Sequence, residues 1–475
     1  MENLISFEWS SLLPEITLFC GAIVILITEA FLPKRAVLIN VFSAAVAILS
    51  VVLGVLFARD TVAFNGTLGA SGGFGIFITA CALLSILLGY GFSAKGGKKG
   101  CEFSAVLLIS AAALSIFVRA QNLMLAFVAL ECATISLYAL SAWNPNKATS
   151  LEASAKYLVN AAVSGGLFLL GIAFIYGSGL ESKVDFLAYE NFTLGLGKVS
   201  FVLGILLVVS AGLFKISAFP FQFWSPDVYQ GSPTPTSAFF AVGSKAAGVV
   251  FLAKVFMALD FSAVPHLADR GVLAASVIAA LTIAVGNLGG LTQTNVKRLM
   301  AFSGISNAGY LLVLLTAGLK LGSTSTNLFE ITLYFYLAAY MFANYGIFFV
   351  INQFDGTDDS NLNISDFRGL IKKSKISEAS MVVNLASLAG IPPTAGFFGK
   401  LLILIMAWYA QLYILMAVMI LGSAASIFYY FSWMRATMDA PEGNECKFEK
   451  MRSVAPTILA LSLATLLFGV SLIKM

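Results

Sequence analysis

Four ionisable side chains lie well inside long apolar runs of the sequence: Glu131, Lys215, Lys245 and Lys400. Insertion scales put one such residue near the centre of a membrane helix at about 2.5 to 3.5 kcal/mol, so the set opposes insertion by roughly 10 to 14 kcal/mol before any pairing. A chain keeps side chains of this cost when they are compensated or carry out a function. Because charges inside a membrane usually mark the path of an ion, the pattern indicates ion transport.

A carboxylate and several lysines can pass a proton from one to the next. Burial favours the neutral form of a lysine, whereas a nearby carboxylate favours the ammonium form. A change in the distance between Glu131 and Lys215 would therefore switch the lysine between proton uptake and proton release. The alternative is a static buried ion pair, with the other lysines bound to backbone carbonyls. We favour the relay, because three lysines and one acid leave a purely paired scheme incomplete.

Other charged residues have simpler interpretations. Lys156 follows Glu152 at the start of a helix, and composition alone indicates a solvated residue at the membrane interface. Glu15 and Glu29 flank the first apolar run and are interpreted as residues at its edges. Lys254 lies closer to the end of a run, from which a lysine can reach the interface.

The sequence contains no pattern for a metal or a redox cofactor. Its cysteines lie without CxxC spacing, and its single histidine, His266, falls in a predicted loop. No phosphate-binding glycine motif follows a strand. We therefore expect the chain to hold no metal, flavin, iron, haem or quinone, and nothing in it suggests nucleic acid binding.

The elements that position these side chains follow from composition. The 475 residues are 59% hydrophobic and 11% charged, against about 25% charged residues in an ordinary soluble domain. Mean hydropathy is +0.91. Apolar runs of roughly 17 to 25 residues, the length of a membrane-spanning α-helix, recur along the chain. They do not alternate between apolar and polar residues as the strands of a membrane barrel do. The composition predicts an all-α polytopic membrane protein.

We predict about 14 transmembrane helices from these runs. The run at 379–411 is too long for one plain span and is interpreted as one interrupted helix. The predicted spans lie near residues 11–32, 36–58, 74–94, 102–118, 121–142, 154–177, 198–222, 236–258, 271–291, 299–319, 329–352, 379–411, 412–434 and 454–474.

Loop cations predict the orientation of the chain. The N-terminal residues lack the features of a cleaved signal peptide, so the first run is expected to remain as a helix. Lysine and arginine are more frequent on one side, which is cytoplasmic by the positive-inside rule, so both termini are predicted to face out, as in a bacterial inner-membrane protein. The cytoplasmic set includes Lys34, Arg35, Lys95, Lys98, Lys99, Lys147, Lys156, Lys297 and Arg298.

Two spans contain prolines that break a helix. One break is at Phe219-Pro220-Phe221, with Pro226 following, and the other is at Gly390-Ile391-Pro392-Pro393. Such interruptions are tolerated where the freed backbone is buried in protein or lines a wet cavity. The segments 235–240 and 393–398 also resemble one another, and each is followed by a lysine. Paired interruptions in two halves suggest an internal repeat.

Residues 219–235 read FPFQFWSPDVYQGSPTP and follow Phe-Lys-Ile at 214–216. This stretch resembles the signature of the antiporter-like subunits of proton-pumping NADH:quinone oxidoreductase (respiratory complex I), and its PDVYQG form resembles the N-type subunit. Supporting matches lie at LPE (13–15), Glu152-Ala153 with Lys156-Tyr157, KRLMAFS (297–303) and GIPPTAGFFGK (390–400). The resemblance covers nearly the whole chain.

This resemblance implies a single transmembrane domain over 1–475, with two inverted five-helix repeats at 102–260 and 271–434, two interrupted helices and a hydrated polar axis. The proton relay it implies consists of Glu131 on helix 5, Lys156 on helix 6, Lys215 on helix 7, Lys245 on helix 8 and Lys400 on helix 12. One departure is Asn307, where relatives commonly carry histidine. Asparagine can hydrogen-bond water but cannot titrate.

The implied function is that of a translocase subunit in the respiratory chain, which moves protons while ubiquinone or another quinone is reduced elsewhere. NADH, FMN, iron–sulfur clusters and quinone are expected in partner subunits, both membrane and peripheral, and none in this chain. One alternative is a subunit of a multi-subunit cation/proton antiporter, whose usual motif has histidine and an Asp-Ala-His run where this chain has Gln222 and Asp227-Val228-Tyr229. Another is a passive membrane scaffold, against which the buried charges argue.

Overall fold

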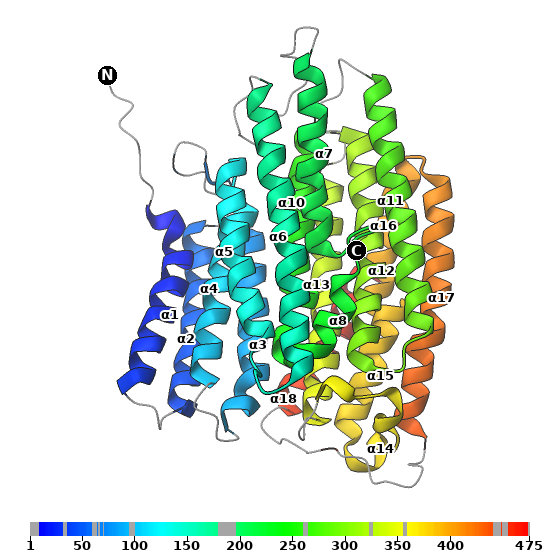
Figure 1. Cartoon of the computed structure of the whole chain (residues 1–475). Helices are drawn as coiled ribbons and strands as arrows, with labels where there is room; N and C mark the ends of the chain where they lie inside the picture. The colour runs from blue at the N-terminus through cyan, green and yellow to red at the C-terminus, as the bar shows by residue number, and fades with distance from the viewer. Residues whose placement is uncertain are drawn as a thin grey trace. The chain divides into compact units, whose positions relative to one another are not determined.

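The computed structural model shows a chain whose regular secondary structure is helical throughout the part described (Figure 1). The two chain ends and the predicted loop cations Lys34, Arg35, Lys95, Lys98 and Lys99 lie outside that part. The described residues are 9–31, 36–58, 64, 67–69, 71–94, 100–178, 196–259, 265–322, 326–354, 359–439, 448 and 455–473.

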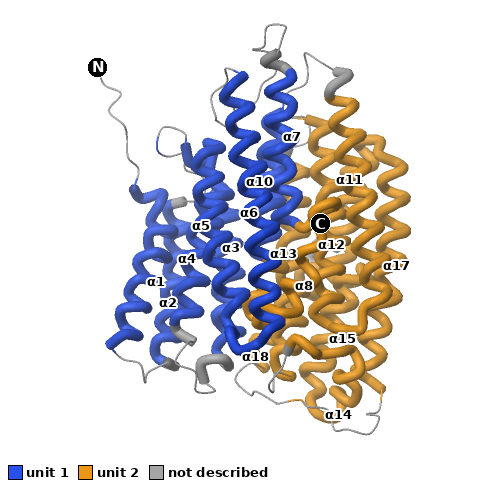
Figure 2. Tube along the Cα trace, viewed as in Figure 1, with its two compact units in different colours: residues 1–216, 243–264 blue, residues 217–242, 265–475 orange. Residues whose placement is uncertain are grey.

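The chain divides into two compact units, which Figure 2 shows in blue and orange. Unit 1 comprises Met1–Ile216 and Gly243–Val264, and unit 2 comprises Ser217–Val242 and Pro265–Met475. The α-helices of unit 1 are α1 (Leu13–Phe31), α2 (Ala36–Leu53), α3 (Gly72–Ala94), α4 (Gly100–Arg119), α5 (Leu123–Ser141), α6 (Ala148–Gly177), α7 (Leu196–Ile216) and α10 (Lys245–Ala258).

Unit 2 contains the remaining helices and three short 3-10 turns at Asn352–Phe354, Asp359–Asn361 and Ile364–Phe367. Its α-helices are α8 (Trp224–Gly231), α9 (Thr234–Phe239), α11 (Pro265–Leu291), α12 (Val296–Leu321), α13 (Thr326–Ile351), α14 (Leu370–Lys373), α15 (Lys375–Ala389), α16 (Ala395–Tyr409), α17 (Tyr413–Met438) and α18 (Ala455–Ile473).

Every predicted span overlaps one or more of these helices. Within the described residues, 12 helical segments are long and apolar enough to cross a membrane, and two shorter apolar helices lie at Ala395–Tyr409 and Ala455–Gly469. An all-helical polytopic membrane protein is therefore confirmed. The helices also expose apolar side chains suited to lipid contact: α17 presents Ile414, Leu421 and Phe428 at seven-residue intervals, and each is at least 70% exposed.

Both predicted interruptions separate two helices. α7 ends at Ile216, short of the predicted 222, and α8 begins at Trp224. The amide of Phe219 lies in this gap and donates to Thr282 Oγ1 of α11 at 3.0 Å, so a side chain replaces the missing helical acceptor. The second gap separates α15 from α16, and Gly390 ends α15 with φ of 85°, a left-handed conformation that glycine adopts without strain.

Packing within each unit brings the charge-bearing helices together. In unit 1, α6 packs on α5 and α7, and α10 packs on α7, α4 and α3. In unit 2, α12 packs on α11, α8 and α16, while α13 packs on α15, α16 and α18. A five-residue π-helical turn at Phe240–Ser244 joins α9 to α10 and ends directly before Lys245. Such turns often occur at functional sites.

Candidate functional site

Lys215 lies in the last turn of α7, and its side chain is only 1% exposed. Its ammonium Nζ donates to the hydroxyl of Tyr157 on α6 at 3.3 Å. The backbone of α10 passes close to the lysine stem, because a Cβ added at Gly248 would lie 3.1 Å from Lys215 Cβ. A buried cation is thus held between two neighbouring helices with a hydroxyl as its partner.

Glu131 of α5 is half-buried and lies against α6 at Gly165, where an added Cβ would collide with its carboxylate oxygen Oε1. Its carboxyl group lies within electrostatic range of the Lys215 ammonium and of the Tyr157 hydroxyl. Among the described residues, however, no ion pair joins Glu131 to Lys215. The hydroxyl of Tyr157 therefore bonds the lysine and lies within electrostatic range of the acid.

Lys245 begins α10 and is almost fully buried. Unit 1 thus contains Glu131 on α5, Lys215 on α7 and Lys245 on α10, of which α7 and α10 pack together, while Lys400 belongs to unit 2. The prediction that these charges are inside the protein is confirmed for the three lysines. Their role in proton transfer stays a prediction.

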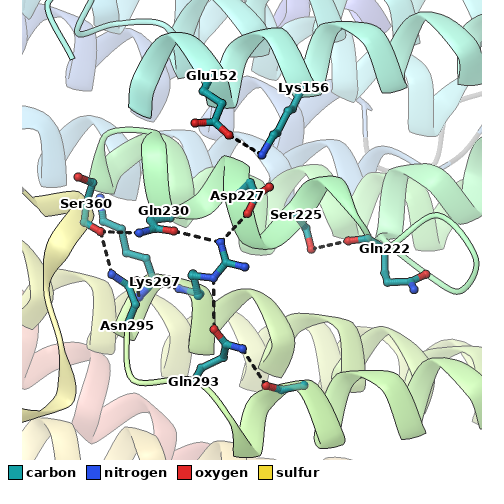
Figure 3. A network of polar contacts seen from close by, with 12 residues as sticks. Glu152, Lys156, Gln222, Ser225, Asp227, Gln230, Gln293, Asn295, Lys297 and Ser360 are labelled. Carbon is teal, nitrogen blue, oxygen red and sulfur yellow. Dashed lines mark hydrogen bonds and ion pairs between the residues drawn. The ribbon is translucent and has the colours of Figure 1, made fainter. Parts of the chain in front are cut away.

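Lys156 differs from the other candidates because its side chain is accessible. Its Nζ lies 2.6 Å from Glu152 Oε1, one helical turn earlier on α6, with the side chains 41% and 62% exposed (Figure 3). This geometry matches a solvated interfacial residue. An exposed pair of this kind typically contributes about 0.3 to 0.5 kcal/mol to stability, so it does not by itself explain a lysine at this position.

Lys400 on α16 uses the backbone freed by the second interruption. Its Nζ donates to the carbonyls of Leu388 and Ala389 at 2.9 and 3.1 Å. It also lies 5.1 Å from the centre of the Tyr310 ring, within range of a cation–π interaction. The last carbonyls of α15 therefore act as acceptors for the buried lysine, as expected where a broken helix leaves backbone groups unpaired.

A cavity of about 10 Å³ adjoins Lys400, close to the least space that one water molecule needs. Its lining includes Asn307 and Tyr336, and the hydroxyl of Tyr336 donates to Asn307 Oδ1 at 2.6 Å. Asn307 in turn donates to the carbonyl of Ser303 at 2.8 Å. Asn307 is thus part of a hydrogen-bonded chain that borders the cavity beside Lys400.

Glu15 lies at the edge of the first span, in the first turn of α1, but the expectation that it is solvated there is wrong, because the residue is only 2% exposed. Arg119, at the end of α4, donates to Glu15 Oε1 at 2.9 Å and to the carbonyl of Ser11 at 2.7 Å. Ser115 adds a hydrogen bond to the same carboxylate at 2.7 Å. A counter-charge 104 positions away in the chain allows the burial of this glutamate.

Lys297 and Arg298 were expected to be loop cations, but they lie in the first turn of α12. Lys297 is fully buried, and its Nζ donates to the carbonyl of Ser232 at 3.0 Å. Arg298 pairs with Asp227 of α8. Both residues belong to the KRLMAFS motif at 297–303, which supports the family resemblance. That motif could have indicated a structured position, because a solvated loop does not require particular residues.

Metal ligands are not clustered in the part of the chain that the structure describes: no group of three or more His, Cys, Asp and Glu side chains lies together there. The described cysteines Cys20, Cys81 and Cys132 form no disulfide bond.

Comparison with known proteins shows which family this chain resembles. Residues 120–426 match the family described as NADH:quinone oxidoreductase/Mrp antiporter, TM. The protein of Opitutus terrae named NADH-quinone oxidoreductase subunit N 1 is 37% identical over 98% of this chain and 95% of its own length.

Two solved structures extend the comparison to the fold. A chain of respiratory complex I from Thermus thermophilus with bound aureothin matches with a TM-score of 0.79 and 28% identity, over 96% of this chain and 97% of that one. A chain of the Mrp complex from Dietzia sp. also matches with a TM-score of 0.79, but at 18% identity it shares the fold alone. As the motif at 219–235 predicts, the chain belongs to the NADH:quinone oxidoreductase/Mrp antiporter family and, within it, to the antiporter-like N-type membrane subunits of NADH-quinone oxidoreductase, a translocase.

Proposed function

We propose that this chain carries protons across the membrane while quinone is reduced in other subunits of the complex. The observation that supports this most strongly is the arrangement of Lys215, Tyr157 and Glu131 on three packed helices. All three side chains can exchange protons, and they lie within an apolar helical bundle. The proposed relay consists of Glu131, Lys156, Lys215, Lys245 and Lys400.

In unit 1 the proton moves between a lysine and a carboxylate by way of a hydroxyl. A protonated Lys215 donates to Tyr157, whose own proton leaves toward Glu131 while the tyrosine takes over the proton of the lysine. The net change is one proton transferred, with Lys215 neutral, Glu131 protonated and Tyr157 restored. Because Lys156 is solvent-accessible on the same helix as Tyr157, we assign it the uptake of protons from the cytoplasmic side.

In unit 2 the proposed carrier is Lys400 with a water molecule in the adjoining cavity. Water there can hydrogen-bond the lysine, the hydroxyl of Tyr336 and the amide of Asn307. Asparagine does not titrate, so the proton passes through the water and the hydroxyl, and Asn307 orients them.

The wider assignment follows the family. We propose 14 transmembrane spans, with inverted repeats at 102–260 and 271–434 inside one transmembrane domain, 1–475. Both termini face the periplasm of a bacterial cell whose inner membrane holds the chain. NADH, FMN, iron–sulfur clusters and quinone are bound by partner subunits, and this chain holds no cofactor.

The test replaces Glu131 by Gln in the complete complex. Glutamine preserves volume but carries no charge that could bias Lys215. We expect normal assembly and quinone reductase activity, with fewer protons moved per electron in reconstituted vesicles. The control is Glu330→Gln at an exposed site on α13, which should pump normally. Normal pumping by an assembled Glu131→Gln complex would contradict the relay and favour a scaffold role, and sodium transport would favour the cation antiporter.

A further inference from the structure

Residues 217–242 have an unusual place in the fold. They pack in unit 2, yet the chain on both sides of them belongs to unit 1. Lys215 lies just before this segment and Lys245 just after it. The backbone therefore joins this segment at one end to Lys215 and at the other to Lys245, the two buried lysines of the proposed relay in unit 1.

Arg298 of α12 bonds the middle of this segment, and Figure 3 shows its partners Asp227, Gln230 and Gln293. Its Nη1 contacts Asp227 Oδ1 at 2.5 Å and Gln230 Oε1 at 3.1 Å, both on α8. Its Nε donates to Gln293 Oε1 at 3.2 Å, which keeps the guanidinium plane in place. The guanidinium thus bonds two residues of α8 through Nη1 and Gln293 through Nε, and lysine, which has a single side-chain nitrogen, cannot reproduce this arrangement.

Lys297, the preceding residue, holds the end of α8. Its buried ammonium donates to the carbonyl of Ser232, the C-cap residue of that helix. A buried ammonium in an apolar bundle is costly, and this bond to a helix-end carbonyl offsets part of the cost.

Uncharged polar side chains hold Lys297 and Arg298 in position at the start of α12. Asn295 caps α12 by accepting from the amides of Lys297 and Arg298, each at 3.1 Å. The amide of Asn295 also donates to the carbonyl of Ser360 at 2.8 Å, and Gln230 donates to the same carbonyl at 3.1 Å. α8, the start of α12 and the turn at Asp359–Asn361 therefore share one hydrogen-bonded network.

The first end of the segment is held as well, through the bond from the Phe219 amide to Thr282 on α11. The segment is thus fixed at its beginning by α11 and along α8 by α12. Its continuation through the π-helical turn at Phe240–Ser244 leads directly into Lys245.

We propose that Arg298 and Lys297 are positioning residues for proton transport. They fix residues 217–242 and, through the continuous backbone, the places of Lys215 and Lys245. This inference rests on the proposed proton transport by those lysines. Neither Arg298 nor Lys297 takes up or releases a proton in this scheme.

Hydrogen–deuterium exchange on the purified complete complex tests the positioning without reference to pumping. In an Arg298→Gln variant we expect amides in 212–216 and 240–246 to exchange about fivefold faster, equivalent to ~1 kcal/mol. Amides of α4 at 103–118 should be unchanged. If faster exchange is confined to α8 at 224–231, the network anchors only its own neighbourhood and the inference is wrong.

Proton transport supplies the second measurement. We expect the Arg298→Gln complex to reduce quinone but to move at most about half as many protons per electron. Arg298→Lys should recover part of the loss, because an ammonium can bond the α8 acceptors but has no second nitrogen for the bond to Gln293 that keeps the group in place. A merely structural role would lower the amount of complex in the membrane and leave the protons per electron unchanged.

The matched control is Arg435→Gln on α17. Its ion pair with Asp439 is long, at 3.9 Å, and the two side chains are 82% and 44% exposed, so both readouts should match the unmodified complex. If Arg298→Gln does not assemble, Asp227→Asn provides the same test, since asparagine retains an acceptor for Arg298 but lacks the charge. Failure of proton transport itself would appear as normal pumping by the Glu131→Gln variant, independently of the exchange result.

Discussion

The ammonium of Lys215 donates to the hydroxyl of Tyr157 at 3.3 Å, and the two residues come from helices that pack side by side. Tyr157 is also stacked on Phe214, the neighbour of the lysine, with ring centroids 6.3 Å apart and planes 21° from parallel. The ring is therefore fixed by packing, while the hydroxyl makes the contact with the lysine. These two contributions can be separated by mutation.

Tyr157→Phe retains the stacked ring and removes the hydroxyl. We expect the complex to assemble normally and to pump fewer protons per electron, because Lys215 loses its link toward Glu131. Proton transport in vesicles, normalised to quinone reduction, measures this. Tyr176→Phe on the same helix is the control, since Tyr176 is 57% exposed. Equal pumping by the two variants would show that the Tyr157 hydroxyl carries no proton.

Gly165 and Gly166 provide a matched pair on α6. A Cβ at Gly165 would collide with the carboxylate of Glu131, whereas a Cβ at Gly166 would meet nothing within 4 Å. Because the obstructing atoms are the end of a flexible side chain, Gly165→Ala should displace the carboxylate with little loss of stability.

We therefore expect Gly165→Ala to lower proton transport and Gly166→Ala to leave it unchanged, with equal amounts of both variants in the membrane. Immunoblotting and vesicle pumping assays give the two quantities. If Gly165→Ala pumps as well as Gly166→Ala, the position of the Glu131 carboxylate is unimportant for transport.

The helices and the buried lysines could be predicted because both are local properties of the sequence. Lys215, Lys245 and Lys400 fall in the interior of apolar runs, so burial follows from the length of the run alone. The interruptions were predictable for the same reason, since proline acts on its own helix.

The burial of Glu15 and Lys297 could not be predicted in this way. Both lie near the ends of runs, where a side chain can face water or protein, and the choice depends on distant partners. Arg119 is 104 positions from Glu15, and Ser232 is 65 positions from Lys297. The contact of Tyr157 with Lys215 could not be predicted for a different reason. A tyrosine in an apolar run gives the same sequence pattern whether its hydroxyl bonds a lysine or its ring only packs against neighbours.

The buried Glu15–Arg119 pair leads to a prediction about stability. Glu15→Gln keeps the volume of the side chain but leaves the guanidinium of Arg119 without its counter-charge in a buried site. Removing one partner of such a pair typically costs about 3 to 5 kcal/mol. We expect less of this chain in the membrane and a lower melting temperature of the purified complex.

Asp439→Asn, at the C-cap of α17, is the control for this loss, because its ion pair with Arg435 is exposed and is expected to contribute about 0 to 1 kcal/mol. Equal abundance and equal melting temperatures for the two variants would mean that the Glu15–Arg119 pair does not stabilise the N-terminal helices.

The last prediction concerns Lys400, whose ammonium bonds the two carbonyls at the end of α15. A static role requires only that a cation satisfy these acceptors, and Lys400→Arg would supply one. A relay also requires that the group release its proton, which arginine does not do near neutral pH. Lys400→Met keeps most of the length and packing of the side chain but has no proton to give.

A relay therefore predicts that both variants transport protons poorly, even where Lys400→Arg accumulates normally. A static role predicts that Lys400→Arg is tolerated and that Lys400→Met is lost from the membrane, because its two carbonyls are left without a donor. Pumping and abundance measured on the same vesicles separate these outcomes. An Lys400→Arg complex that assembles and pumps like the unmodified one would remove Lys400 from the relay, and the cavity beside it would then serve only to hydrate the break between α15 and α16.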